Sequence, residues 1–302
     1  MTRAYAPVSP PVALTVAGSD SGGGAGIQAD LQTFAAHGVF GTSVVAATTA
    51  QNTQGVAESH VVPVDHLRAQ YRAVADDFPV GAVKTGMLAT AEVVETVTDL
   101  LADFEGPAVV DPVMVAASGD RLLSEDAEAA YRGLLGTARL ATPNADEAAV
   151  LAGEEIATLD DARVAGERIR ETGVDAVLVK GGHLADDDDE VVDTLVTADG
   201  VERFTHPRVD TRATHGSGCV LSSAVAARLA SGEELVDAVE GATAFLERAV
   251  RYGVDVGEGP GAVHHLAALR EAADRHRTMT DVAEVVEAFV DRDVSRLRPP
   301  GG

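Results

Sequence analysis

Short apolar runs alternate with amphipathic helical segments along almost the whole chain. Such alternation favours a largely parallel β-sheet, and a parallel sheet is normally covered by helices on both faces. The predicted strands are 12–17, 43–50, 57–64 (a short strand or flap), 80–84, 107–111, 138–142 and 175–180, followed by a hairpin over 190–206. The predicted helices are 27–38, 65–77, 90–103, 124–135, 144–152 and 160–173, with helices dominating from Gly216 onward. The sequence therefore predicts an α/β fold with a central, mostly parallel sheet.

The charge balance argues against nucleic acid as a partner. Aspartate and glutamate number 48 against 23 lysines and arginines, which gives a formal net charge of −25 over 302 residues. Such a surface repels phosphate backbones. We interpret the acidity as adaptation to high salt, where mobile ions screen self-repulsion. An ordinary acidic protein from a GC-rich genome is the alternative.

Lysine is almost absent, and its scarcity singles out two positions. Among the 23 basic residues only Lys84 and Lys180 are lysines, in the segments VGAVKTGML and AVLVKGGH. Each follows an apolar run and precedes glycine or a glycine-containing turn, which places both at strand ends, where α/β folds build their sites. We therefore expect both lysines to serve the function.

The chain ends and the cysteine content bear on location and domains. A single cysteine rules out internal disulfides and favours a reducing compartment. Residues 1–11 lack the apolar core of a signal peptide, and no apolar run approaches the length of a membrane span. We expect a cytoplasmic protein without a membrane partner. Its predicted parts are an N-terminal extension over 1–11, a main domain over 12–269 and a helical tail over 270–302.

The segment GSGC, Gly216 to Cys219, carries the strongest chemical signal. It runs directly into a helical pattern of small residues, CVLSSAVAARLA. Backbone N–H groups of a glycine-rich turn and the positive end of a helix together attract an anion such as a phosphoryl group. Cys219 stands at that helix N-terminus, where the pKa of its thiol is predicted to fall. The turn is typical of the transfer centre of a small-molecule kinase; the alternative is a small buried apolar residue.

Three features near the N-terminus point to a ligand. The glycine-rich loop from Gly18 to Gly26 lacks the P-loop pattern, yet it allows a backbone to approach a flat ligand closely, unless it is only a flexible connection. Asp30 follows on the next helix and either binds an amine or hydroxyl group or is a simple helix N-terminal charge. Gln51 offers a donor and an acceptor that suit an aminopyrimidine edge, or it caps its strand.

Two acids and a lysine suit a metal–nucleotide complex. Asp111 at a strand end and Glu147 on a helix are candidates to hold Mg²⁺ through water, although each alone is equally a surface acid. Lys180 is a candidate partner for phosphates. The histidines, among them His215, show no zinc spacing and are expected to be solvated or part of the core.

Taken together, these motifs resemble the hydroxymethylpyrimidine/phosphomethylpyrimidine kinases of thiamine biosynthesis, within the ribokinase-like superfamily. The matching segments occur in family order from residue 12 to about 266 and are AGSDSGGGAGIQADLQTF, AATTAQNTQGV, VKTGML, VVDPVMVAASGDRLL, ATPNADEA, LVKGGH, THGSGC and GAVHH. No single segment is decisive, but the ordered set is specific. The resemblance implies a three-layer α/β/α sandwich and a homodimer.

The resemblance also implies roles for individual residues. It implies that the pyrimidine is surrounded by Gly18, Ala25, Asp30, Gln51, Met87 and Val113. It implies that Asp111 and Glu147 serve the metal, and that Asn144, Glu147 and Lys180 serve the nucleotide. By the same comparison Gly216, Ser217 and Gly218 form an anion hole, and Cys219 is the catalytic base where sugar kinases of the superfamily carry an Asp. The implied cofactors are ATP and Mg²⁺, with K⁺ as a further candidate.

The implied reaction is ATP-dependent phosphorylation of 4-amino-5-hydroxymethyl-2-methylpyrimidine and then of its monophosphate. One departure from the family is Ala117, which replaces a common lysine and puts the second phosphorylation in doubt. Some relatives continue into a thiamine-phosphate synthase domain, and the tail from about 270 resembles the entry to it. The alternatives are a kinase for pyridoxal or pyridoxine and a non-catalytic pyrimidine sensor.

Overall fold

A computed structural model describes residues 7–114, 125–182, 184 and 189–267, with the side chains of 125–128 excepted. The chain divides into two compact units, Met1–His265 and Leu266–Gly302. The fold and the site described below belong to the first unit. Ala117 and the predicted tail over 270–302 lie outside the described residues.

One sheet forms the centre of the first unit, and its described strands number nine. They are β1 (Val12–Ser19), β2 (Phe40–Asn52), β3 (Gly55–Val61), β4 (Val80–Thr85), β5 (Ala108–Val110), β6 (Leu140–Ala141), β7 (Ala176–Val179), β8 (Glu190–Val196) and β9 (Val201–Pro207). The strand order is β3-β2-β1-β4-β5-β6-β7-β8-β9. All pairs from β2 to β7 are parallel, whereas β3, β8 and β9 pair antiparallel at the two edges. The predicted mostly parallel sheet is confirmed, as is the hairpin near 190–206.

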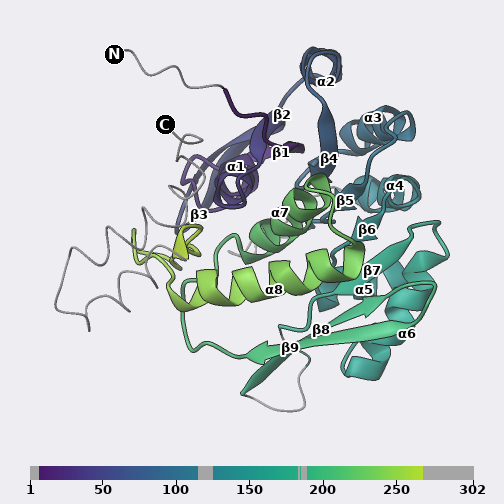
Figure 1. Cartoon of the computed structure of the whole chain (residues 1–302), viewed down its shortest axis with the longest axis vertical. Coiled ribbons are helices and arrows are strands. Elements are labelled where there is room, and N and C mark those ends of the chain that lie inside the picture. Colours follow the sequence, from purple (N-terminus) through teal and green to yellow (C-terminus); the bar gives the residue numbers. More distant parts are fainter. Residues whose placement is uncertain (1–6, 115–124, 183, 185–188, 268–302) are drawn as a thin grey trace, which may run out of the picture. The chain divides into compact units, whose positions relative to one another are not determined.

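Helices cover both faces of this sheet, as Figure 1 shows. They are α1 (Gly26–Ala36), α2 (Val64–Ala75), α3 (Ala91–Ala102), α4 (Glu125–Leu135), α5 (Ala145–Ala152), α6 (Leu159–Arg170), α7 (Ser217–Ala230) and α8 (Leu235–Arg251). One apolar core joins the sheet to α2 through α6, and a second joins it to α1, α7 and α8. The predicted α/β/α sandwich is therefore confirmed. None of the described helices has the length and apolar character needed to cross a membrane.

The topology fixes where a ligand can bind. Strand β1 lies between β2 and β4, so the chain leaves β1 in one direction along the sheet and later returns on its other side. A crevice opens at the carboxyl ends of the strands at such a switch point. The glycine-rich loop follows β1 there, Lys84 and Asp111 lie at or just beyond the ends of β4 and β5, and Lys180 follows β7.

Candidate active site

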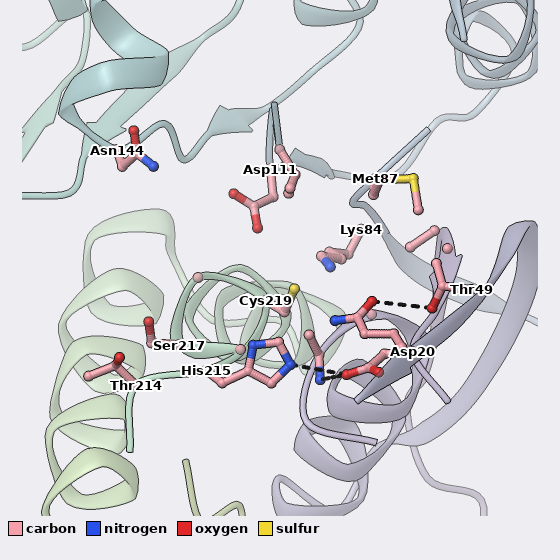
Figure 2. A pocket seen from close by; sticks show the side chains of 18 of the residues that line it. Asp20, Thr49, Lys84, Met87, Asp111, Asn144, Thr214, His215, Ser217 and Cys219 are labelled. Atoms are coloured by element: carbon pink, nitrogen blue, oxygen red, sulfur yellow. Dashed lines mark hydrogen bonds and ion pairs between the residues drawn. The ribbon is translucent and has the colours of Figure 1, made fainter. Parts of the chain in front are cut away.

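A cavity of about 430 Å³ opens at this edge of the sheet. Figure 2 shows the side chains that converge on it. The predicted site residues that line it are Gly18, Ala25, Gln51, Met87, Asp111, Val113, Asn144, Glu147, Lys180, Gly216, Ser217, Gly218 and Cys219. Segments up to about 200 residues apart in the sequence are thus brought to one space.

The anion-binding turn has the conformation that its glycine predicts. Gly216 caps α7 with φ of 80°, in the left-handed region, and a Cβ there would overlap the carbonyl oxygen of Gly24 in the first glycine loop. The N–H of Ser217 donates to the carbonyl of Thr214 at 3.1 Å, so it is not free for a ligand, contrary to the prediction for this residue. The N–H groups of Gly218 and Cys219 stand in the first helical turn, where a helix supplies no acceptor.

The thiol of Cys219 is half-buried at this turn. Burial raises its pKa to about 11, even though the Lys84 ammonium group and the Gly26 N–H act in the opposite direction. The prediction that the pKa of this thiol falls is therefore wrong for the empty cavity. Desolvation of the anionic thiolate, together with nearby carboxylates, outweighs the helix N-terminus. The resting form at neutral pH is the thiol.

Asp111, Glu147 and Lys180 form a charged cluster on another wall. The Lys180 Nζ donates to the Asp111 Oδ1 at 3.0 Å and lies 3.9 Å from the Glu147 Oε2. Burial raises the pKa of Glu147; Lys180 opposes this rise and Asp111 reinforces it. With both carboxylates ionised the cluster carries two negative charges and one positive charge, and an added cation would stabilise that state.

Asn144 and Glu147 also have a structural task. The Asn144 side chain accepts from the Glu147 N–H at 2.8 Å, and the Glu147 carboxylate accepts from the Asn144 N–H at 2.8 Å. This reciprocal pair is a capping box at the start of α5. One oxygen of each side chain is thus committed to the helix, and the Glu147 carboxylate also accepts from the Met114 N–H. The Asn144 Nδ2 and the remaining lone pairs of the carboxylate are what these residues can offer a nucleotide or metal.

The opposite wall surrounds Gln51. Its Oε1 lies 3.2 Å from the Thr49 hydroxyl, which also lies 2.9 Å from the Ser19 carbonyl oxygen. Met87 contacts Gly18 so closely that a Cβ on Gly18 would overlap the methionine methyl group. The N–H groups of Gly18 and Ala25 already donate to the Met87 carbonyl and the Asp20 carboxylate. We call this part of the cavity, which is lined by Gly18, Ala25, Gln51 and Met87, the slot; Gln51 contributes its carboxamide there.

Asp30 is not in the cavity, and the prediction that it contacts a ligand is wrong. Its carboxylate is fully buried beneath the site. It accepts from the Lys84 Nζ at 2.8 and 2.9 Å, from the Thr15 hydroxyl at 2.6 Å and from the Ser223 hydroxyl at 2.7 Å. Both oxygens are satisfied by the protein itself, so none is left for a substrate.

Asp20 and His215 line the cavity although the sequence analysis did not assign them to it. Asp20 accepts from the N–H groups of Gly22, Gly24 and Ala25 and from the His215 Nε2 at 3.1 Å. Burial alone raises the pKa of Asp20, but these hydrogen bonds outweigh it and hold the pKa below its usual value. The pair joins the two glycine-rich loops. The position of Asp20 inside GSDSGGG and of His215 directly before GSGC was the available signal.

Comparison with known proteins identifies what this arrangement belongs to. The sequence model of the phosphomethylpyrimidine kinase family matches residues 20–264, which include the glycine loop, the charged cluster and the anion-binding turn. The chain belongs to this family. A hydroxymethylpyrimidine/phosphomethylpyrimidine kinase of Streptomyces coelicolor is 50% identical over 272 residues, which cover 90% of this chain and 100% of the relative.

Solved structures similar to this chain include a member of the same family and members of a second kinase family, the pyridoxal kinases. The pyridoxal kinase of Bacillus subtilis, solved as an ADP complex, superposes with a TM-score of 0.80 at 34% identity and covers 86% of this chain and 99% of its own. The phosphomethylpyrimidine kinase of Clostridium difficile gives a TM-score of 0.70 at 39% identity, over 79% of this chain and 99% of its own. Both phosphomethylpyrimidine and pyridoxal kinases therefore share the ribokinase-like fold of this chain.

Proposed function

We propose that this kinase transfers the γ-phosphoryl group of ATP to 4-amino-5-hydroxymethyl-2-methylpyrimidine and then to its monophosphate, as a step of thiamine biosynthesis. One observation carries the proposal: the slot residues Gln51 and Met87 line the same cavity as the Cys219 turn and the Lys180 cluster. A ring held in the slot can present a hydroxymethyl group to a phosphoryl group at the turn. A relative of 50% identity carries both kinase activities in its name.

Each group of residues has a distinct task in this proposal. Gln51 pairs with the polar edge of the ring, while Met87 and Val113 pack against its faces. The substrate hydroxyl oxygen forms the new bond to the γ-phosphorus, the bond from that phosphorus to the β–γ bridging oxygen breaks, and ADP leaves. The hydroxyl proton passes to the Sγ of Cys219 in its thiolate form. The N–H groups of Gly218 and Cys219 stabilise the charge on the transferring phosphoryl group, and Lys180 pairs with the phosphates.

Asp111 and Glu147 fit a Mg²⁺ ion that enters the site bound to the nucleotide. The described part of the chain contains no cluster of three or more His, Cys, Asp or Glu side chains arranged to hold a metal. Mg²⁺ in kinases needs only one or two carboxylates in addition to phosphate oxygens and water. Asp111 and Glu147 supply that number, and their surplus negative charge favours a cation. The ion supplies charge neutralisation on the phosphates when it is bound.

Four further properties belong to the proposal. We infer K⁺ as a second cation, a homodimer, a cytoplasmic location and a surface adapted to high salt. The net charge of −25 and the near absence of lysine support the last of these. The same charge supports the inference that nucleic acid is not a partner.

Pyridoxal is a second candidate substrate, because pyridoxal kinases of Bacillus subtilis and Staphylococcus aureus superpose with TM-scores of 0.80. Pyridoxal is also a flat heteroaromatic ring that carries a hydroxymethyl group. The carboxamide of Gln51 favours the aminopyrimidine, since it can pair with adjacent donor and acceptor atoms of the ring. The ratio of kcat/KM for the two alcohols separates the candidates.

Product analysis tests the function directly. The enzyme is incubated with MgATP and the aminopyrimidine alcohol in concentrated KCl, and the products are separated by liquid chromatography with mass detection. We expect the monophosphate to form first and the diphosphate to follow. Binding of the alcohol without pyrimidine-dependent ATP turnover would instead support the sensor alternative and contradict the kinase.

Replacing Gln51 by leucine should raise KM for the aminopyrimidine roughly 10- to 100-fold. An unpaired polar edge of the ring in the slot costs about 1–3 kcal/mol. Steady-state kinetics at saturating ATP measure the change, with Gln54→Leu as the matched control because Gln54 is exposed and lies outside the cavity. An unchanged KM in Gln51→Leu would remove this residue from the substrate site.

A further inference from the structure

The chain has only two lysines, and both belong to the wall of the same cavity. Lys180 has its task in the charged cluster described above. Lys84 has been given no task so far, and its side chain is completely buried although it borders the cavity. A fully buried lysine is rare and must be paired. In a chain that avoids lysine almost everywhere else, this ammonium group requires an explanation.

The burial of Lys84 is compensated by a dedicated network. Its Nζ lies 2.8 and 2.9 Å from the two carboxylate oxygens of Asp30, and Thr15 and Ser223 donate to the same carboxylate. Burial alone would lower the pKa of Lys84, but the Asp30 carboxylate outweighs burial and raises it. The lysine therefore carries its positive charge at neutral pH.

The Lys84–Asp30 ion pair has a fixed orientation relative to the cavity. Lys84 is part of the cavity wall and Asp30 is not, so the positive end faces the cavity and the negative end faces the core. Figure 2 shows the Lys84 side chain directed toward the part of the cavity where the Cys219 thiol lies. An ion pair oriented in this way favours negative charge in the space in front of it.

Several charged or titratable side chains lie around the Cys219 thiol, the Lys84–Asp30 pair among them. They are Asp30 on α1, Lys84 on β4, Asp111 after β5, Lys180 after β7 and His215 before α7. Lys84 is the strongest of the side chains that lower the pKa of the Cys219 thiol, and Asp30 is the strongest that raise it. The two halves of the ion pair thus act on the same sulfur with opposite sign, and the lysine has the larger effect.

We propose that Lys84 is a positioning residue for phosphoryl transfer: its ammonium group, held by Asp30 below the cavity, favours the thiolate form of Cys219. The proposal rests on the proposed role of Cys219 as the base. Lys84 acts through the sulfur and not on the substrate, so it should affect kcat and leave KM for ATP and for the pyrimidine unchanged. The thiolate then accepts the hydroxyl proton, and the lysine itself neither gains nor loses a proton.

The single cysteine allows a test that needs neither substrate nor turnover. Iodoacetamide alkylates the thiolate, so the rate of alkylation of the free enzyme at a fixed pH reports the fraction of Cys219 in that form. The rate is measured by mass spectrometry between pH 7.5 and 9.5, relative to the same variant in denaturant. Circular dichroism and ADP binding confirm that each variant is folded.

Two variants give the expected pattern. Asp30→Asn/Lys84→Met removes both charges without leaving either one unpaired, and should alkylate at least about threefold more slowly than the wild type, because the lysine has the larger effect on the thiol. Ser223→Ala removes one hydrogen bond to the same carboxylate, leaves both charges, and should stay within about twofold.

Alkylation of the double variant at the wild-type rate or faster would overturn the proposal. If the ion pair had only a structural role, its loss would loosen the packing around α7, expose the thiol and speed alkylation. The result is independent of the proposed reaction, because failure of the kinase assay with an intact alkylation pattern would contradict the function and leave the electrostatic role of Lys84 in place.

Discussion

Replacing Cys219 by alanine is expected to lower kcat by about 10²- to 10⁴-fold, the range for loss of a general base. The affinity for the pyrimidine alcohol should change little, since Gln51 and Met87, and not Cys219, hold the ring in the proposed mode. Single-turnover kinetics measure the chemical step, and isothermal titration calorimetry measures binding of the alcohol. Equal losses in turnover and in binding would contradict the role of the sulfur as the proton acceptor.

Two controls separate the base from a packing role of Cys219. Cys219→Ser keeps the size of the side chain but carries a hydroxyl of much higher pKa, so it should be nearly as inactive as the alanine variant. The wild-type kcat/KM should rise about tenfold per pH unit between pH 7 and 9, because kcat/KM reports the free enzyme and burial raises the pKa of its thiol to about 11. Near-normal activity of Cys219→Ser would show that only the volume matters.

Replacing Gly216 by alanine should abolish most of the activity and lower the melting temperature. The residue has φ of 80°, which costs an alanine about 1–2 kcal/mol, and the added Cβ would overlap the Gly24 carbonyl oxygen. The overlap forces the two glycine-rich loops apart, and a displacement of about 1 Å at a reacting centre can cost about 100-fold in rate. Calorimetry and kcat/KM measure the two effects.

Gly232→Ala is the matched control for this prediction. Gly232 has φ of 84° but no atom within 4 Å of its added Cβ, so only the conformational cost applies. We expect a similar strain energy of about 1–2 kcal/mol and a kcat/KM within twofold of the wild type. If both variants lose activity to the same extent, the contact between the loops has no part in catalysis.

The order and type of the elements could be predicted because the periodicity of apolar residues is strong in this chain. Strand β2 is longer than predicted, Phe40–Asn52 instead of 43–50, since it pairs with β1 at one end and with β3 at the other. The residues of β2 and their neighbours in the sequence do not reveal where it pairs with β1 and β3. Element boundaries depend on such pairings more than on the residues themselves.

The errors at the site have a physical cause as well. Asp30 lies three residues after Ile27 and four before Phe34, on one face of α1, so helical spacing already placed it toward the core. Its partner Lys84 is 54 residues away, and no local pattern joins them. The raised pKa of the Cys219 thiol likewise follows from desolvation and from carboxylates on other segments, which a motif of four residues cannot reveal.

The placement of the two lysines allows selective chemical labelling of the cavity. Lys84 is sealed in the interior, whereas Lys180 retains a side-chain exposure of 16% at the charged cluster. An acylating reagent that attacks ε-amines therefore finds its one solvent-accessible lysine inside the candidate active-site cavity. Protection of that amine from acylation becomes a direct reading of cavity occupancy, free of the background that a lysine-rich surface would add.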